Sequence, residues 1–441
     1  MSDRNNSDYY NFDNYDESID SREYRRRQPN RRNNRNTTMN GRPPYNKRRP
    51  SKRRMRARTR NRIIMVATGV LAITLVIVLL VLMIRSCNPG GSSTNASTET
   101  KPAETTAAVA ATESTNAAPV NSDKLAIDNF IPANPTDNNA SGYVANAIYV
   151  WNNQAFELFG GSDDTVEGYV DMVNDLSGKL TGMNVYSMII PNHTEMGLPA
   201  RLKDSGDAPT TSQADNIKTA YAAMDKSKVT PINAYNYLSE HCNDYIYFKS
   251  DHHWTGLGSY YAYTAFADTL GMPKLALEDC TEGTIDGFTG SLYNYAEGID
   301  TDTVHYWQFP YSVTMDITDD YGNTQTYDSP YFEGEEGGSL AYGVFIFGDN
   351  PLTVMKSSSD KATAGRKIAV IKESYGNAFV PYLTCNYEEV HVCDLRSFRD
   401  ASSVDFPTYC RNNGITDVLF LNGVMSANNA DHFDSIEAMF N

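Results

Sequence analysis

Two histidines stand side by side in the stretch DHHW, Asp251–Trp254, in a chain that has only seven histidines. An aspartate next to an imidazole fixes the tautomer of the ring and stabilises the imidazolium that forms when the ring takes up a proton. In an extended backbone, residues i and i+2 point to the same side. Asp251 and His253 are therefore expected to pair as half of an acid–base site, while His252 points the opposite way.

The same stretch has two other interpretations. A metal site needs further ligands, and neither an HxxxH nor an HxH partner accompanies the pair. Alternatively, Asp251 is only a turn residue, and both histidines are ordinary surface or core side chains. On these four residues alone the alternatives stay open.

A candidate nucleophile follows much later in the chain. The stretch KIAVIKESYGNAFVPYL (367–383) predicts a strand, a tight turn that carries Ser374, and then a helix. A serine in that position exposes its hydroxyl at the edge of a sheet, where amides near the start of the helix can bind an oxyanion. The GxSxG pattern is missing, and a plain helix-capping role is the alternative for this serine.

The elements around these motifs alternate between strand and helix patterns, which favours an α/β domain with a mainly parallel sheet. Ser162 and Thr255 are expected to cap helices, the second of which ends at Gly271. Strands are expected at 184–191, 245–248, 367–371, 389–395 and 417–423, with a strand pair at 147–159. The DHHW stretch and Ser374 would then both lie at the carboxyl edge of the sheet, where open α/β folds place their sites. Residues 281–350, rich in Tyr, Gly and Asp, are expected to be irregular or β-rich and to line the site.

The charges of the 441-residue chain are divided between two regions, although the net charge is −16. Residues 1–62 hold 19 Lys+Arg and 7 Asp+Glu, whereas residues 86–441 hold 18 Lys+Arg and 47 Asp+Glu. Between them the run Ile63–Ile84 has 22 residues and no charge, enough to cross a hydrocarbon core of about 30 Å. Basic residues before the run, and only Arg85 after it, predict a single-pass membrane protein with a cytoplasmic N-terminus.

This division predicts four regions. Residues 1–62 form a disordered basic cytoplasmic tail, 63–85 the transmembrane helix, 86–124 a linker rich in Ser, Thr, Ala and Pro, and 125–441 the folded extracytoplasmic domain. The basic tail lies beside a membrane span, which indicates contact with anionic lipid rather than nucleic acid. None of the six cysteines forms a CxxC pair, so a thiolate zinc site is disfavoured and one or two disulfides are expected.

The stretches FKSDHHWTGLGSYYAYTAF and IKESYGNAFVPYL together resemble the DHHW family of bacterial membrane-anchored proteins, over roughly residues 125–441. That family is similar to the SGNH-hydrolase-like domains of alginate O-acetyltransferases. The resemblance implies a flavodoxin-like α/β sheet flanked by helices and a catalytic triad. In this triad Ser374 is the nucleophile, His253 the general base and Asp251 its orienting carboxylate.

The oxyanion and substrate contacts follow less directly, because the GDS and GxND blocks of SGNH hydrolases are missing. The backbone amides of Ser374 and Tyr375 are the first candidates. Gly290, in FTGSLYNYAEG, offers a second amide, and the side chain of Asn377 is a further donor. Trp254, the last residue of the motif, is a candidate for contact with substrate.

The resemblance implies a membrane-anchored, extracytoplasmic O-acyltransferase that acetylates a cell-envelope or secreted polysaccharide. It needs no cofactor or metal, and a multi-pass membrane acyltransferase would supply the acetyl group. A carbohydrate esterase or deacetylase with the same triad is one alternative. A catalytically inactive envelope protein that binds polysaccharide or acts as a scaffold is another.

Overall fold

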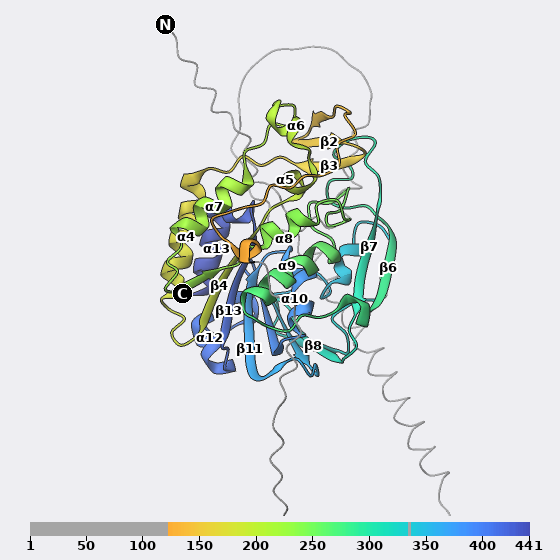
Figure 1. Ribbon diagram of the computed structural model, residues 1–441. Helices are drawn as coiled ribbons and strands as arrows, with labels where there is room; N and C mark the ends of the chain where they lie inside the picture. The colour runs from red at the N-terminus through yellow and green to blue at the C-terminus, as the bar shows by residue number, and fades with distance from the viewer. Residues whose placement is uncertain (1–121, 334–336) are drawn as a thin grey trace, which may run out of the picture. The chain divides into compact units, whose positions relative to one another are not determined.

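The computed structural model describes residues 122–333 and 337–441 (Figure 1). The predicted tail 1–62, membrane helix 63–85 and most of the linker lie outside these ranges. Within them, no helix combines the length and the apolar character needed to span a membrane. The last linker residues already begin a short helix, α3 (Ser122–Leu125).

An eight-stranded sheet forms the centre of the described domain, in the order β5-β4-β13-β11-β12-β10-β8-β9. Its first five strands are parallel: β5 (Val229–Pro231), β4 (Asn184–Ile190), β13 (Asp417–Gly423), β11 (Thr363–Lys372) and β12 (Tyr387–Asp394). Three antiparallel strands extend it: β10 (Leu352–Ser357), β8 (Val313–Thr318) and β9 (Thr324–Tyr327). The mainly parallel sheet is confirmed, and the apolar runs of β4, β11 and β13 suit strands that are covered on both faces.

The order of the five parallel strands locates the functional edge of the sheet. If β11, β12, β13, β4 and β5 are renumbered 1 to 5, their order across the sheet, starting from β12, is 2-1-3-4-5. This is the flavodoxin-like order. The first of these strands along the chain, β4, occupies the fourth position of that numbering. The strand order reverses between β11 and β13, and ligands of such sheets bind in the crevice at the carboxyl ends of these two strands.

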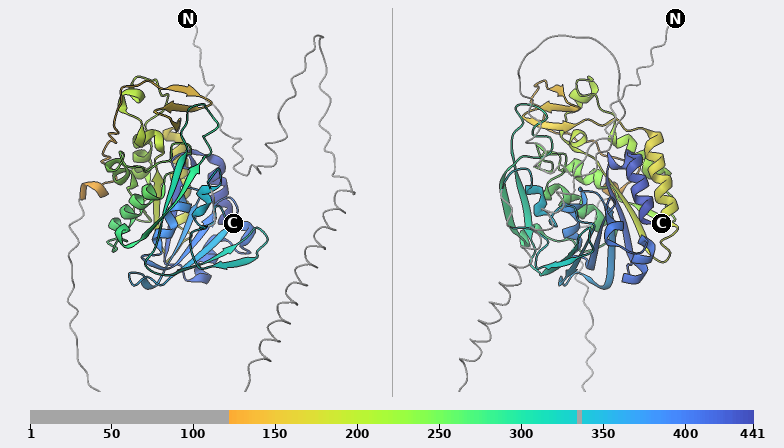
Figure 2. Two further views of the ribbon diagram at one scale, coloured as in Figure 1. Left: turned by 90° about the vertical axis from the view of Figure 1, so that its right-hand side faces the viewer. Right: turned by 180° about the vertical axis from the view of Figure 1, so that it is seen from behind.

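Helices cover both faces of the sheet (Figures 1 and 2). On one side α4 (Asp163–Ser177) packs on α7 (Gln213–Ala223) and α13 (Ala430–Met439), and on the other α9 (Gly256–Thr269) packs on α8 (Ala234–Glu240) and α10 (Gly376–Leu383). The shorter helices are α5 (His193–Gly197), α6 (Ala200–Asp204), α11 (Phe398–Ala401) and α12 (Phe406–Asn413), with 3₁₀ turns η1 (Leu277–Asp279), η2 (Ala341–Val344) and η3 (Ser426–Asn428). Both predicted caps are confirmed: the Thr165 amide donates to Ser162 Oγ at 3.3 Å, and the Gly258 amide to Thr255 Oγ1 at 3.2 Å.

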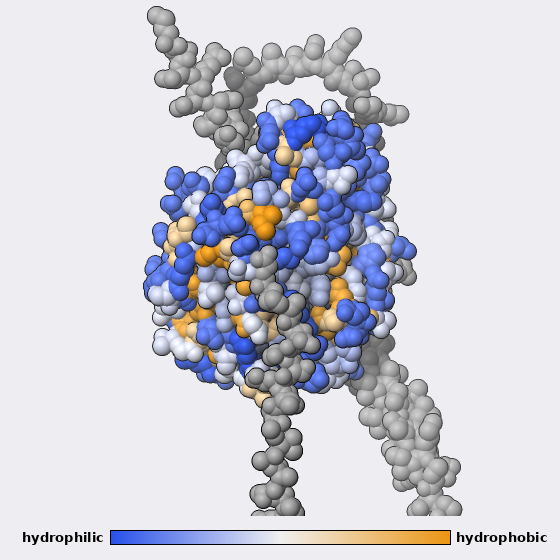
Figure 3. Space-filling view, in the orientation of Figure 1, coloured by the Kyte–Doolittle hydropathy of each residue, from blue (hydrophilic) through white to orange (hydrophobic). Residues whose placement is uncertain are grey.

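Two smaller antiparallel sheets flank the central one. The strands β1 (Tyr143–Ala145), β2 (Ile148–Trp151) and β3 (Gln154–Glu157) form the first, which contains the predicted strand pair. The strands β6 (Thr281–Phe288) and β7 (Asp302–Gln308) form the second, within the region expected to be β-rich. In the orientation of Figure 1 the surface is largely hydrophilic, with small scattered apolar areas (Figure 3).

Two expectations are wrong. Residues 245–248 form no strand of a sheet, because the chain turns back and pairs with itself through a single bridge between Tyr247 and Trp254. The Thr255 amide donates to the Ile246 carbonyl at 2.9 Å, so backbone groups are satisfied inside this loop rather than by a neighbouring strand. Disulfides are also missing among the residues with described positions, where Cys242, Cys280, Cys385, Cys393 and Cys410 are all free thiols.

Candidate active site

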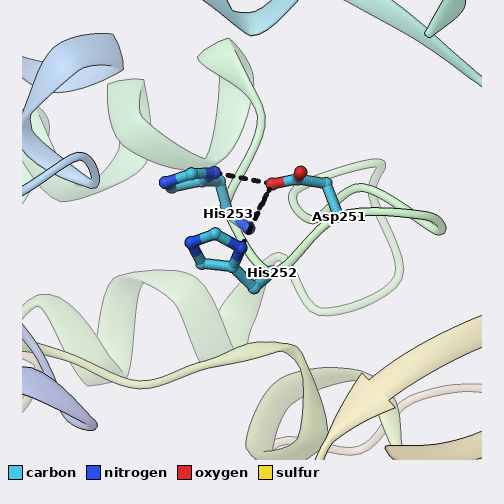
Figure 4. Close-up of side chains that lie close together, drawn as sticks. All are labelled: Asp251, His252 and His253. Atoms are coloured by element: carbon cyan, nitrogen blue, oxygen red, sulfur yellow. Dashed lines mark hydrogen bonds and ion pairs between the residues drawn. The ribbon is translucent and has the colours of Figure 1, made fainter. Parts of the chain in front are cut away.

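The structure brings Ser374, His253 and Asp251 into one chain of hydrogen bonds. His253 Nε2 lies 2.7 Å from Ser374 Oγ, and His253 Nδ1 lies 2.6 Å from Asp251 Oδ1. All three residues are buried, with 4–5 % of their surface exposed. Figure 4 shows the Asp251 carboxylate directed at the His253 ring, with the His252 ring beside it. A hydroxyl, an imidazole and a carboxylate in this order have the geometry of a nucleophile, a base and an orienting group.

The pairing of Asp251 with His253 has a different origin from the predicted one. The loop is not extended; Asp251 Oδ1 accepts both the backbone amide of His253, at 2.9 Å, and the ring Nδ1 of the same residue. This local turn brings the two side chains together. His252 does not point the opposite way, because its ring lies 3.8 Å from the His253 ring, centroid to centroid, and its Nδ1 contacts Ser291 Oγ at 2.7 Å. The argument from strand alternation was wrong in its geometry.

The charge of Asp251 is stabilised by its surroundings. Burial alone would raise the pKa of this carboxyl, but the two neighbouring histidines and a hydrogen bond from His253 hold the pKa well below its usual range. The backbone amide of Ser291 donates to Asp251 Oδ2 at 2.7 Å and adds to this effect. The carboxylate is therefore ionised at any pH at which the protein would work, and it can stabilise an imidazolium at His253.

Two side chains outside the proton path, those of Trp254 and Tyr342, hold the serine turn between β11 and α10. Trp254 Nε1 donates to the carbonyl of Tyr375 at 2.9 Å, and Tyr342 Oη donates to the carbonyl of Ser374 at 3.0 Å. Trp254 is fully buried. Its indole therefore ties the serine turn to the loop that carries His253, and it is not available as a platform for substrate.

Tyr342 also contacts His253 directly. The two rings are stacked, with centroids 4.1 Å apart and an interplanar angle of 9°. Burial raises the pKa of Tyr342 well above its usual value, and the carboxylates of Asp251 and Glu373 add to this shift. The phenol therefore stays neutral, and its ring packs against the His253 imidazole.

The amide of Tyr375, a first candidate for an oxyanion donor, is engaged by Glu373. Glu373 Oε2 accepts this amide at 2.9 Å and lies 3.5 Å from Ser374 Oγ, while its Oε1 accepts the amide of Gly423 at 2.8 Å. Since Gly423 ends β13, the buried Glu373 carboxylate spans the crevice between the ends of β11 and β13. It joins the two strands at the point where the strand order reverses.

Asn377 belongs to a second network that lies behind the serine turn. Its Oδ1 accepts from Lys372 Nζ at 2.7 Å, and its Nδ2 donates to Asp349 Oδ1 at 2.9 Å. Lys372 has no exposed surface and also contacts Asp394 Oδ2 at 2.9 Å. Burial alone would lower the pKa of Lys372, but the carboxylates of Asp394 and Asp349 raise it, so the lysine is charged. Asn377 is thus occupied in holding α10 to the end of β11 and to the loop that carries Asp349.

Gly290 contributes space near the triad. Its amide donates to Ser250 Oγ at 3.0 Å, and a Cβ at this position would lie 2.2 Å from the Cβ of Asp251. Only glycine allows this close approach. Ser250 in turn donates to Asp302, which also accepts the amides of Lys249 and Ser250 at 2.9 Å and 2.8 Å. Asp302 is therefore the side chain that holds the backbone immediately before Asp251.

The group Asp251, His252 and His253 also has the donor types of a metal site, since one ligand atom from each lies within 4.8 Å of the others. In the triad both ring nitrogens of His253 are hydrogen-bonded, Nδ1 to Asp251 Oδ1 and Nε2 to Ser374 Oγ. Ligation of an ion by His253 would require one of these two bonds to break. The metal interpretation and the triad interpretation therefore compete for the His253 ring.

Several residues of the site were not found from the sequence. Lys372 and Glu373 carry a usable signal, because they are two charged residues at the end of an otherwise apolar strand and directly before Ser374. Asp302 and Tyr342 carry none, because they lie in a region without a regular hydrophobic pattern and reach the site only through the tertiary fold.

Comparisons with known proteins agree with this architecture. A DHHW protein from Eubacterium siraeum has a crystal structure with a TM-score of 0.59 and 29% sequence identity; the match covers 68% of this chain and 98% of that one. Bacillus cereus PatB1 matches with a TM-score of 0.52 and 20% identity, over 66% of this chain and 98% of that one, and a second PatB1 structure carries a sulfonyl adduct. At this identity the PatB1 likeness shows the fold alone.

Other similar structures are more distant. The O-acetyltransferase domain of Pseudomonas putida AlgJ matches with a TM-score of 0.38 and 9% identity, over 68% of this chain and 99% of that domain. No curated protein matches the chain. The family model described as DHHW protein matches residues 98–393, about two thirds of the chain, and this range contains the DHHW stretch and the serine turn. The chain therefore belongs to the DHHW protein family.

Proposed function

We propose that this protein is an extracytoplasmic O-acyltransferase that moves an acetyl group onto a hydroxyl of a glycan through Ser374. The observation that carries the proposal is the continuous path from Ser374 Oγ through both nitrogens of His253 to Asp251. Its place at the switch point of a flavodoxin-like sheet agrees with an SGNH-hydrolase-like domain. The likeness to PatB1 supports the same fold.

The reaction follows from the roles of the three side chains. Ser374 Oγ attacks the carbonyl carbon of the acyl donor and gives its proton to His253 Nε2. The tetrahedral intermediate collapses, and the leaving group takes this proton as it departs from the acylated serine. A sugar hydroxyl then attacks the acyl group, its proton passes to His253, and His253 returns it to Ser374 Oγ as the sugar ester leaves. Asp251 stays ionised and stabilises the imidazolium in both halves.

The oxyanion needs donors that are not already engaged. The amides of Tyr375 and Gly290 donate to Glu373 and Ser250. The Ser374 amide has no hydrogen-bond acceptor among residues 122–333 and 337–441. We therefore assign the Ser374 amide as the backbone donor to the oxyanion.

The setting of the reaction is part of the proposal. The apolar run at 63–84 would anchor the protein in the cell membrane with its N-terminus in the cytoplasm and the triad outside. A multi-pass membrane acyltransferase would deliver the acetyl group, and the acceptor would be a cell-envelope or secreted polysaccharide. The excess of Asp and Glu in residues 86–441 disfavours strongly anionic acceptors.

A carbohydrate esterase would use the same three residues with water as the acceptor. Acetyl transfer and hydrolysis are distinguished by supplying an activated acetyl ester with a neutral oligosaccharide and measuring how the acetyl group divides between sugar ester and free acetate. A transferase acetylates the sugar in a Ser374-dependent way, whereas an esterase yields acetate alone.

The proposal is tested first by covalent labelling. Sulfonyl fluorides react with activated serine hydroxyls, and a similar structure carries a sulfonyl adduct. Phenylmethylsulfonyl fluoride is therefore expected to label Ser374, detected by peptide mass spectrometry, with labelling strongly reduced in His253→Ala and unchanged in His252→Ala. Equal labelling of wild type and His253→Ala, or no labelling, would favour a catalytically inactive scaffold.

A further inference from the structure

A cavity of about 310 Å³ lies outside the triad, between the β2–β3 hairpin, helix α5 and the segment that precedes the DHHW stretch. None of the three triad residues lines it. The residues that line it include His193, Gln154, Trp151, Tyr245, Tyr247 and Lys249. Its volume is at the lower end of the range for small-molecule sites.

His193 is the unusual residue of this cavity. Its ring stacks on Tyr247, with centroids 5.4 Å apart and an interplanar angle of 9°, and lies 4.2 Å from the Phe156 ring. Only 8% of the residue is exposed, and the ring lies near the backbone of Ala155, although Nδ1 has no hydrogen bond of good geometry among the described groups. Burial lowers the pKa of His193 to about 3, so the ring is neutral at physiological pH. A buried, unsatisfied ring nitrogen destabilises the fold, and such groups are concentrated where function retains them.

The surrounding groups are suited to a polar, uncharged ligand. The side-chain amide of Gln154 is half-buried and has no hydrogen-bond partner in the part of the chain that the structure describes. A Cβ at Gly197 would lie 2.6 Å from His193 Nε2, so the missing side chain leaves room for the imidazole at this wall. Lys249 already has a loose ion pair with Asp300, at 3.7 Å.

We propose that this cavity binds one neutral sugar ring of the glycan acceptor. Sugar hydroxyls both donate and accept hydrogen bonds, which matches an amide and a neutral imidazole, and the apolar faces of a sugar ring match aromatic walls. The acidic composition of residues 86–441 disfavours a uronate or a phosphate there. The identification of the ligand as an acceptor rests on the proposed function, whereas the binding of a sugar does not.

The cavity is connected to the catalytic loop through the backbone. The amide of Ala155, on β3, donates to the carbonyl of Lys249 at 2.7 Å, and Asp251 follows two residues later. Lys249 and Ser250 are held at the same place by Asp302. A glycan unit in this cavity would thus contact the segment that carries Asp251 and His253, and further units would extend from there along the surface.

The test measures binding directly, on the full-length protein in detergent, by isothermal titration calorimetry and ligand-detected NMR with the neutral oligosaccharide tetra-N-acetylchitotetraose. Binding is expected in the wild type and to the same degree in Ser374→Ala. The variant Gln154→Ala should weaken it by about fivefold, the effect of losing one hydrogen bond. Gln325→Ala removes an exposed amide on β9 and serves as the matched control.

His193→Phe supplies the second variant, because it keeps an aromatic ring against Phe156 and Tyr247 and removes the unsatisfied nitrogen. It should weaken binding while its thermal unfolding midpoint rises at pH 5, where wild-type folding is opposed by protonation of the unfolded histidine. Undetectable binding up to about 10 mM, equal affinity in Gln154→Ala and wild type, or preference for tetragalacturonate would overturn the proposal. Normal binding combined with a failure to acetylate would leave it standing and contradict the proposed function instead.

Discussion

The serine turn (373–375) and the histidine loop (250–253) meet at the triad but are held in place by different means. The turn ends β11, a central strand with parallel partners on both sides, and leads directly into α10. The loop lies off the sheet and, in the described chain, is closed by only one bridge, between Tyr247 and Trp254. Its backbone is held by side chains, above all Asp302. Strand pairing positions one half of the site, whereas the other half depends on side-chain hydrogen bonds together with isolated backbone contacts, such as that of the Leu292 amide with the Ser250 carbonyl at 2.9 Å.

This difference predicts how each half responds to change. Backbone hydrogen bonds of a central strand are insensitive to most single substitutions, so the turn should depend on the buried groups behind it. The conformation of the loop should depend mainly on one carboxylate, that of Asp302. The largest effects are nevertheless expected at the two residues through which the halves touch.

Removing either contacting residue should abolish turnover. Ser374→Ala and His253→Ala are each expected to lower the rate of ester turnover by about 10⁴-fold or more, because nucleophile and base act as a unit. His252→Ala is the matched control, since its ring lies beside His253, whereas the ring nitrogen hydrogen-bonded to Ser374 Oγ is Nε2 of His253. It should retain activity within about tenfold. A greater loss in His252→Ala than in His253→Ala would reverse the assignment of the two histidines.

The buried network behind the serine turn should dominate stability. Lys372→Met removes the buried cation shared by the carboxylates of Asp349 and Asp394 and leaves them only the half-buried Arg396, so the free energy of unfolding is expected to fall by about 3–5 kcal/mol in urea titrations. Lys356→Met, at a lysine that is half exposed, should change it by less than about 1 kcal/mol. Equal effects of the two substitutions would contradict the role of the network.

The same network predicts a pH dependence. Burial would raise the pKa of Asp349 and Asp394, but Lys372 and Arg396 lower both values below the ordinary range. The stability that these ionised carboxylates contribute is present above the unfolded pKa of about 3.9 and is lost as the pH falls below it. In Lys372→Met only Arg396 remains to hold these carboxylates ionised, so unfolding between about pH 5 and 3 should become less sensitive to acid than in the wild type.

The histidine loop is tested through Asp302. Asp302→Asn replaces one of the two carboxylate oxygens by an NH2 group, so the side chain can no longer accept hydrogen bonds from the backbone amides of Lys249 and Ser250 at the same time. The free energy of unfolding should fall by about 1–3 kcal/mol. Ester turnover should fall about tenfold or more, because His253 is less well positioned. Asp300→Asn, two residues earlier in the chain, is the control, because the Asp300 carboxylate has only long contacts in the described chain, with Lys249 Nζ at 3.7 Å and Asn153 Nδ2 at 3.5 Å. An inactive Asp300→Asn with an active Asp302→Asn would show that the loop is held in another way.

The smallest effect is expected at Glu373. Glu373→Gln keeps the size of the side chain but satisfies only one of the two amides, Tyr375 and Gly423, that the carboxylate now accepts. Since Glu373 positions the serine turn, kcat should fall about tenfold with little change in KM. A change confined to KM would place Glu373 in substrate binding instead.

The two halves also differ in how far they could be predicted. The strand–turn–helix around Ser374 was predicted correctly, because a continuous apolar run, a short polar turn and a second apolar stretch leave few other structures. The segment before the histidine loop, Tyr245–Phe248, was predicted to be a strand, because it has the composition of one. The actual conformation of the loop depends on Asp302 and on residues near Gly290, which lie some 40 to 50 positions away and show no periodic pattern.

The candidate triad itself came from residue types and from a family resemblance, and the geometry used to support it was wrong. Asp251 and His253 pair through a local turn, not through strand alternation. The proposed oxyanion donors show a further limit. Tyr375 and Asn377 follow Ser374 closely in the chain and Gly290 lies against Asp251, but each of the three is engaged by a partner, Glu373, Lys372 or Ser250, in a contact that the sequence alone does not reveal.

The measurement that tests the central claim most directly is single-turnover acylation. The purified protein is mixed with p-nitrophenyl acetate, quenched rapidly, and analysed by intact-mass and peptide mass spectrometry. The account predicts a burst of about one nitrophenolate per protein, one acetyl group on Ser374, and neither burst nor label in His253→Ala. A wild type that forms no acetylated Ser374, or an acetyl group that appears equally in His253→Ala, would contradict the triad.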